Sequence, residues 1–119
     1  MESETKTHVD QIKSPTGYPV AVLRYVGDIA STSKEAVLGS YEALPRETTK
    51  LILLDFTKVD YINSSGIALV IQLLIQAAHS GQTVCIYGLS AHFTKVFTMV
   101  GITKYARLFP SQTDALAAL

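Results

Sequence analysis

The sequence predicts a single α/β domain with a mixed, mostly parallel β-sheet, in the order β-β-α-β-α-β-α-β-α. The chain has 119 residues, of which 48% are apolar, which is enough for one domain with its own core and too few for two. Two nearly continuous apolar runs, residues 50–56 (KLILLDF) and 82–88 (QTVCIYG), are typical of strands covered on both faces. A segment with helical features separates them, and strands that alternate with helices indicate parallel pairing through right-handed crossovers.

The chain is predicted to begin with a flexible tail and a β-hairpin. Residues 1–7 are expected to form the tail, so that the domain covers residues 8–119. Residues 8–13 are a candidate first strand, and residues 19–27 (PVAVLRYVG) are rich in β-branched side chains. The segment SPTGY between them contains proline and glycine and predicts a turn. This hairpin adds one antiparallel pair to the sheet.

The first helix is predicted after the hairpin, within DIASTSKEAVLGSYEALPRE. Thr32 and Glu35 have the spacing of a capping box, in which each side chain bonds the other residue's backbone N–H. Pro45 marks the end of the helix, before the strand at 50–56. The core-facing stripe is expected to contain Ala36, Val37, Tyr41 and Leu44.

Glycines and capping residues delimit the elements that follow. A second helix is predicted from about Ser64 to His79, with Asn63 or Ser64 as its N-cap and Gly81 after its end. The strand at 82–88 comes next.

A third helix, a short strand and a last helix complete the chain. Ser90 can cap a helix that runs through Val100 and stops at Gly101. Residues 105–109 (YARLF) are predicted to be a strand, and residues 111–119 (SQTDALAAL) a helix. The positions of the third helix with core spacing are Phe93, Val96, Phe97 and Val100.

The second helix carries no charge. No Asp, Glu, Lys or Arg occurs from Tyr61 to Thr94. Helical spacing predicts a core stripe made of Ile67, Val70, Ile71, Leu74 and Ala78. The opposite side would then present Leu69, Gln72, Leu73 and Gln76. This neutral, partly apolar side is either buried within the domain or a surface that receives a partner protein.

Bulk properties exclude several classes of function. The chain has ten basic and ten acidic residues and a formal net charge of zero, which argues against nucleic acid as a partner because counterion release needs a concentrated basic surface. The longest apolar run, residues 66–78, is too short to span a bilayer, and the polar N-terminus has no signal peptide. We therefore expect a cytoplasmic protein without direct membrane insertion. Cys85, the one cysteine, is expected to be a buried core residue.

Motifs for catalysis and for cofactors are missing from the sequence. NSSGIA is not the G-x-S-x-G of serine hydrolases, and no base stands in a suitable context. No pair of His, Cys, Asp or Glu has metal-ligand spacing, and both glycine-rich phosphate loops are absent. We expect a protein that is not an enzyme and uses no cofactor or metal.

Ser64 and Ser65 are the remaining chemical feature. A helix N-terminus offers free N–H groups and a positive dipole, so it can accommodate a phosphate without unfolding. A phosphate on Ser64 would add a charge of about −1.5 to −2 beside a neutral surface. Capping and a phosphorylation switch are therefore compatible roles for this helix start.

At this point the residues resemble a known family, the STAS domain. The resemblance covers nearly the whole chain, including VGDIASTSKEAV. It rests on an apolar strand that ends in Asp, a serine pair and glycine at a helix start, a strand between two glycines, a helix that ends in glycine, and a closing Phe–Ala–Leu pattern. In this chain these features are residues 51–55, Asn63-Ser64-Ser65-Gly66, 81–88, Gly101 and 109–116.

The resemblance implies an anti-sigma factor antagonist. In that family a kinase-type anti-sigma factor phosphorylates the first serine, which would be Ser64 here, with Ser65 as the alternative. The unphosphorylated protein binds the kinase and releases the sigma factor, and a PP2C-type phosphatase resets it. The residues expected to bind the partner are Ala30, Ser31, Asn63, Ser64, Ser65, Gly66, Leu69, Gln72 and Leu73.

The chain departs from the family pattern at two positions. The family's acid before the serine is Asn63 here, and a second acid aligns with Ala30. Both positions are expected near the phosphorylation site. The alternative is a constitutive, non-phosphorylated STAS subunit of a transporter or signalling complex. A neutral apolar patch can also drive self-association, so a homodimer is compatible with the sequence.

Overall fold

A computed structural model describes residues 4–119. It contains one five-stranded sheet in the spatial order β1-β2-β3-β4-β5, with β1 antiparallel to β2 and the other neighbours parallel. The predicted mixed, mostly parallel sheet and the predicted order of strands and helices are therefore confirmed. The strands are β1 (Lys6–Lys13), β2 (Pro19–Val26), β3 (Leu51–Lys58), β4 (Thr83–Tyr87) and β5 (Ala106–Phe109).

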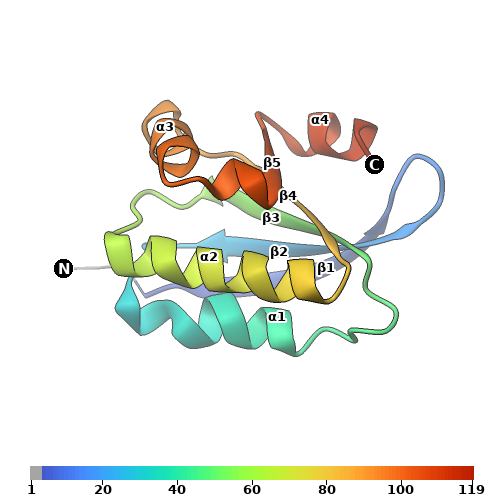
Figure 1. Ribbon diagram of the computed structural model, residues 1–119, viewed down its shortest axis with the longest axis horizontal. Coiled ribbons are helices and arrows are strands. Elements are labelled where there is room, and N and C mark those ends of the chain that lie inside the picture. Colours follow the sequence, from blue (N-terminus) through green and yellow to red (C-terminus); the bar gives the residue numbers. More distant parts are fainter. Residues whose placement is uncertain (1–3) are drawn as a thin grey trace.

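The helices lie on both faces of this sheet (Figure 1). Side chains of a strand point alternately to the two faces, so Ala21, Leu23 and Tyr25 face one core cluster and Val20 and Val22 the other. The helical segments between residues 35 and 104 pack their apolar side chains into the first cluster, and the last helix packs against the second. The helical elements are η1 (Ser31–Ser33), η2 (Glu35–Gly39), α1 (Ser40–Glu42), α2 (Ser64–His79), α3 (Ala91–Met99), η3 (Ile102–Lys104) and α4 (Gln112–Ala117).

The first helix is not a regular α-helix from a capping box. It consists of a 3₁₀ turn, a π-helical segment and a short α-helical end. The expected Thr32–Glu35 box is wrong, because Ser33 Oγ accepts the backbone N–H of Ala30 at 2.9 Å instead. Val37 and Tyr41 are buried as predicted, so the side of the helix that faces the core was read correctly.

The hairpin starts earlier than predicted. β1 begins at Lys6, so residues 6 and 7 of the expected tail belong to a strand, whereas residues 1–3 lie outside the described residues. The Thr7 hydroxyl donates to the carbonyl of Ala36 at 2.5 Å and joins β1 to η2.

Two buried side-chain contacts connect distant segments. Tyr41 donates to Oε1 of Gln82 at 2.5 Å, and the Gln82 amide donates to the Thr49 carbonyl at 2.9 Å.

Phe93 and Phe97 of α3 are buried, but Val100 is 48% exposed. The prediction that Val100 faces the core is wrong, since α3 ends at Met99 and the chain turns away at Gly101. Among residues 4–119, no helix is long and apolar enough to cross a membrane.

Candidate functional site

Ser64 and Ser65 occupy the first two positions of α2, and both are exposed. The N-cap is Asn63, whose side-chain Oδ1 accepts the Gly66 N–H at 2.8 Å. This resolves the predicted choice between Asn63 and Ser64 as the cap. The serine hydroxyls are therefore available to solvent at the positive end of a sixteen-residue helix.

The loop that carries Ala30 and Ser31 lies against this helix start. Ile29 forms a parallel bridge with Ile62, its N–H donates to the Tyr61 carbonyl at 2.9 Å, and its carbonyl accepts the Asn63 N–H at 3.1 Å. Ala30 is buried and Ser31 is exposed. The two segments that the sequence analysis expected near Ser64 are thus joined in space.

Gly66 allows this close approach. A Cβ atom at position 66 would lie 2.3 Å from the carbonyl oxygen of Ile29 and 2.7 Å from its carbonyl carbon. Real Cβ atoms do not approach backbone that closely, so the contact requires glycine. The signal for it in the sequence was the glycine itself, after the two serines.

Three further residues support the loop, and sequence reasoning did not identify them. Ser33 Oγ holds the Ala30 N–H at 2.9 Å. The Thr5 hydroxyl lies 2.5 Å from Ser33 Oγ and also donates to the carbonyl of Asp28. Thr5 precedes β1 by one residue and fell within the expected tail, so no local pattern pointed to it. Ile29 was missed because a buried isoleucine gives no sign of its backbone contacts.

The outer face of α2 differs from the predicted one. Leu69 is 7% exposed and Leu73 is 0% exposed, so the expectation that they form an accessible patch is wrong. The helix packs against the sheet and also against η1 and η2, which covers two of its sides. At 100° per residue the buried arc is rotated by roughly a quarter of a turn from the predicted stripe.

The exposed side of α2 is nonetheless neutral. Gln72 is exposed as predicted, and Ile75, at 36% exposure, replaces the two leucines as the accessible aliphatic side chain. Ala68 lies between Gln72 and the two serines along the helix. The exposed positions of the helix are Ser64, Ser65, Ala68, Gln72, Ile75, Ala78 and His79. This uncharged strip is the surface that a phosphate at Ser64 would alter.

The charged side chains with shifted pKa values lie elsewhere, on the sheet face that α4 covers in part. Arg24 bonds Asp10 at 2.6 Å and Asp55 at 2.8 Å, and it also donates to the Tyr87 hydroxyl at 3.0 Å. Tyr87 in turn donates to Gln112 of α4 at 2.9 Å. The cluster ties four strands and α4 together.

The two carboxylates of this cluster are held in their charged form. The hydrogen bond from Arg24 lowers the pKa of Asp10. Burial alone would raise the pKa of Asp55, but hydrogen bonds from the Thr57 hydroxyl and amide and from Arg24 lower it overall. Burial, together with the Asp55 charge, raises the pKa of Tyr87 to about 12. These groups are locked in a structural network and do not face Ser64, which lies beyond the end of β3.

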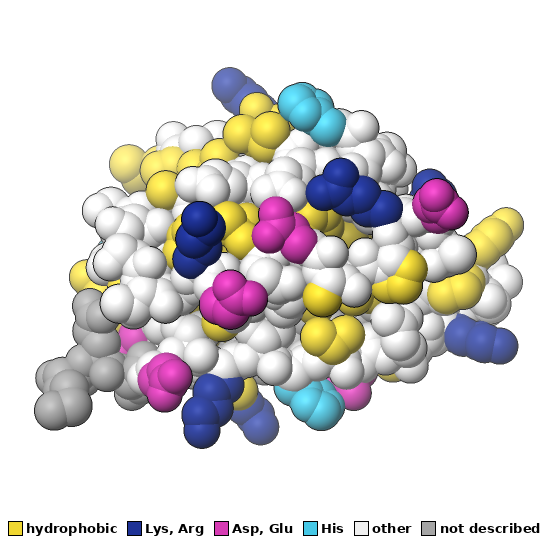
Figure 2. Space-filling view, turned by 90° about the horizontal axis from the view of Figure 1, so that it is seen from below, with side chains coloured by type: hydrophobic (Ala, Val, Ile, Leu, Met, Phe, Trp, Pro, Cys, Tyr) yellow, Lys and Arg dark blue, Asp and Glu magenta, His cyan; other side chains and the backbone are white. Residues whose placement is uncertain are grey.

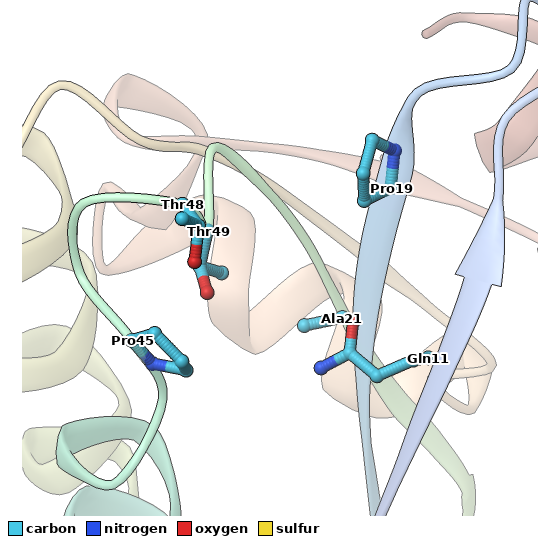
Figure 3. Close-up of a pocket in the computed structure, with 6 residues that line it drawn as sticks. All are labelled: Gln11, Pro19, Ala21, Pro45, Thr48 and Thr49. Atoms are coloured by element: carbon cyan, nitrogen blue, oxygen red, sulfur yellow. The ribbon is translucent and has the colours of Figure 1, made fainter.

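One hollow of the surface has a lining without acidic or basic side chains. A cavity of about 290 Å³ lies between the hairpin and the segment before β3 (Figure 3). Its lining is neutral, with Thr48 and Thr49 as the hydroxyl groups, and its other residues are Gln11, Pro19, Ala21 and Pro45.

Around α1, acidic and basic side chains are interspersed (Figure 2). Among residues 4–119, no three His, Cys, Asp or Glu side chains are grouped as metal ligands would be.

Comparison with known proteins matches the chain to one family of domains. The sequence profile of the STAS domain matches residues 11–115. An anti-sigma factor antagonist from Mycobacterium paratuberculosis has a similar structure, with a TM-score of 0.79, 17% sequence identity, and coverage of 97% of this chain and 93% of that one. The cell fate determinant SpoIIAA of Bacillus, in its phosphorylated form, gives 0.69 at 16% identity, with coverage of 94% and 97%.

A protein of the sulfate transporter family from Wolinella succinogenes has the same fold. It gives a TM-score of 0.74 at 19% identity, and 83% of each chain is covered. The fold is therefore shared by anti-sigma factor antagonists and by STAS domains of transporters.

Proposed function

Because this chain belongs to the STAS domain family, we propose that it is an anti-sigma factor antagonist switched by phosphorylation of Ser64. In its unphosphorylated form it binds a serine-kinase anti-sigma factor, and the phosphorylated form is released. The observation that carries this proposal is an exposed Ser64 at the first position of α2, next to an uncharged helix face.

A phosphate at this position changes the surface without unfolding the helix. The Asn63 side chain already caps the Gly66 N–H, and the remaining N–H groups of the first turn have no intrahelical acceptor. Added negative charge is favourable there by about 0.3–1 kcal/mol. A partner that packs on a neutral surface must instead accommodate a charge of about −1.5 to −2, so it dissociates.

The partner surface follows from the corrected face of α2. It comprises the helix start with Ser31, which lies on the adjoining loop, and continues along Ala68, Gln72 and Ile75. Leu69, Leu73, Gly66 and Ala30 shape this surface from beneath, since they are buried. A PP2C-type phosphatase that removes the phosphate needs the same exposed helix start.

Two substitutions at Ser64 test the switch. Ser64→Ala should bind the kinase with the affinity of the unmodified chain, and Ser64→Asp should bind at least about tenfold more weakly, a difference of about 1.4 kcal/mol. Thr113→Asp is the control, because it adds the same charge to an exposed position of α4, on the other face of the sheet. Equal affinity of the Ser64→Ala and Ser64→Asp proteins in isothermal titration calorimetry would refute the switch.

A constitutive STAS subunit of a transport or signalling complex is the second candidate function. Asn63 and the buried Ala30 favour it, since neither supplies the acid that the family has at these positions. The acids of the same two loops are Asp28 and Asp60, one and two residues from the Ile29–Ile62 bridge. A purified complex that contains a transport ATPase or permease, and that Ser64→Asp leaves intact, would decide for this candidate.

We propose a binding function without catalysis and without a cofactor. A serine nucleophile needs a base within hydrogen-bond reach, and the sequence around Ser64 supplies none. Labelling of Ser64 by a serine-reactive fluorophosphonate probe would contradict this.

A further inference from the structure

A groove runs between α3 and β5, away from the α2 surface. Its volume is about 430 Å³. Leu89, Leu108 and Phe109 give it an apolar floor, and Lys95 stands on its α3 side. The remaining lining residues are Ala91, Thr94 and Pro110. The groove therefore combines a hydrophobic surface with one cationic group.

The groove is bordered by the backbone of an edge strand. Among residues 4–119, β5 pairs with β4 and with no other strand. The carbonyl of Phe109 accepts the Gly88 N–H on the β4 side. Backbone groups alternate in direction along a strand, so the N–H and C=O groups of Leu108 and Ala106 point to the outer edge. An edge strand beside a helix is the arrangement into which an extended peptide can insert as an additional strand.

The charged residues of the segment that forms the groove are all positive. No Asp or Glu occurs from Tyr61 to Thr113. The charged residues in this part of the chain are Lys95, Lys104 and Arg107, and the Arg107 guanidinium lies 5.0 Å from the centre of the Phe109 ring. The whole chain is neutral, so these cations are balanced by acids in other segments.

We propose that this groove binds an extended segment of a partner protein in which acidic and apolar residues alternate. The segment pairs with the outer edge of β5, and its apolar side chains enter the groove beside Leu108. Its carboxylates lie on the opposite face of the strand, which carries Arg107, and Lys95 adds positive charge at the groove. Side chains of an extended peptide alternate between two faces. This alternation matches β5, in which Leu108 and Arg107 lie on opposite faces.

Two other occupants fit less well. A second copy paired edge to edge would bring together Arg107 of both β5 strands, with Lys104 of η3 just before each strand. Like charges repel there, and residues 61 to 113 contain no acid. An anionic membrane offers no backbone to pair with β5, and its surface does not fill a concave groove.

The test is a titration of the ¹⁵N-labelled full chain with the peptide Asp-Val-Glu-Leu-Glu-Val-Asp, followed by NMR. The expected dissociation constant is on the order of 100 µM. Amide signals of Ala106, Leu108 and Lys95 should shift, and the Leu108 amide should exchange more slowly with deuterium because it gains an acceptor. The peptide with lysine in place of each acid should bind at least about tenfold more weakly.

Charge reversal on the protein provides the matched control. Lys95→Glu combined with Arg107→Glu should weaken peptide binding at least about tenfold. Lys34→Glu combined with Lys50→Glu makes the same change in net charge at two exposed positions elsewhere, and binding should stay within about twofold. Ser64→Asp should leave binding unchanged, so the outcome is independent of the Ser64 switch.

Four results would overturn the proposal. They are shifts confined to other segments, no binding at millimolar peptide, equal binding of the acidic and lysine peptides, and full binding by the Lys95/Arg107 double variant. If the Leu108 amide is protected from deuterium exchange without peptide, and sedimentation velocity shows a dimer, the outer edge of β5 would be assigned to a second copy. Binding to phosphatidylglycerol vesicles but not to the peptide would assign the surface to a membrane.

Discussion

Gly66→Ala is expected to destabilise the protein, although alanine is the best helix former. In an exposed helix this substitution would stabilise by about 1 kcal/mol. Here the new Cβ would lie 2.3 Å from the Ile29 carbonyl oxygen, and ordinary contact begins at 3.4 Å. The Ile29 loop must therefore retreat by roughly 1 Å, which strains its bridge to Ile62 and the hydrogen bond from Asn63.

The size of the effect follows from these two opposing contributions. Overpacking costs about 1–3 kcal/mol, and a weakened backbone hydrogen bond costs about 1 kcal/mol more. After the gain in helix propensity is subtracted, the free energy of unfolding should fall by about 1–3 kcal/mol. For a chain of 119 residues this lowers the thermal midpoint by roughly 3–12 °C.

Gly39→Ala is the matched control for this measurement. Gly39 is also helical, and the atom nearest to a Cβ there is the Glu35 carboxylate oxygen at 2.5 Å, at the end of a side chain that can rotate away. Gly39→Ala should therefore stabilise by up to about 1 kcal/mol. Urea unfolding followed by circular dichroism measures both variants. If Gly66→Ala stabilises as much as Gly39→Ala, the close contact between the Ile29 loop and α2 is refuted.

Further predictions concern the face of α2 and the ionic cluster. Leu73→Ala should lower the free energy of unfolding by about 2–5 kcal/mol because the side chain is fully buried, whereas Ile75→Ala should cost less than about 1 kcal/mol in urea unfolding. Ile75→Ala should still weaken kinase binding in calorimetry, and an unchanged affinity would remove this face from the interface. In the folded chain the pKa of Asp55 lies below its ordinary value of 3.8. The stability that the Asp55 carboxylate contributes is therefore fully present above pH 3.8 and is lost as the pH falls through the lower folded-state pKa. The Asp55→Asn protein should therefore be less stable than the unmodified chain at pH 7, and its stability should fall less on acidification. Parallel curves of unfolding free energy against pH for the two proteins would contradict this.

The sequence was sufficient to predict the sheet and the order of strands and helices. Continuous apolar runs identified β3 and β4, and β-branched residues identified β2. The irregular first helix could not be predicted, because its 3₁₀ and π-helical turns depend on tertiary contacts such as that of Thr7 with the Ala36 carbonyl. Thr5 could not be predicted either, since its partners are the Asp28 carbonyl before η1 and the Ser33 hydroxyl within η1.

The helix start was predicted better than the helix face. Capping chemistry is local, so Asn63 and the two serines could be placed from spacing alone. The rotation of α2 was not accessible, because apolar residues occupy most sides of this uncharged helix and periodicity gave no unique face. Only the packing of η1 and η2 against it shows that Leu69 and Leu73 are covered while Ile75 is accessible.

The most direct measurement is incubation of the purified chain with the cognate serine-kinase anti-sigma factor and ATP, followed by peptide mass mapping. We predict one phosphate, on Ser64, and none on the Ser64→Ala protein. Ser65→Ala should be phosphorylated like the unmodified chain. An unmodified chain in the presence of a kinase that phosphorylates another substrate, or a phosphate that persists in Ser64→Ala, would contradict a switch at Ser64.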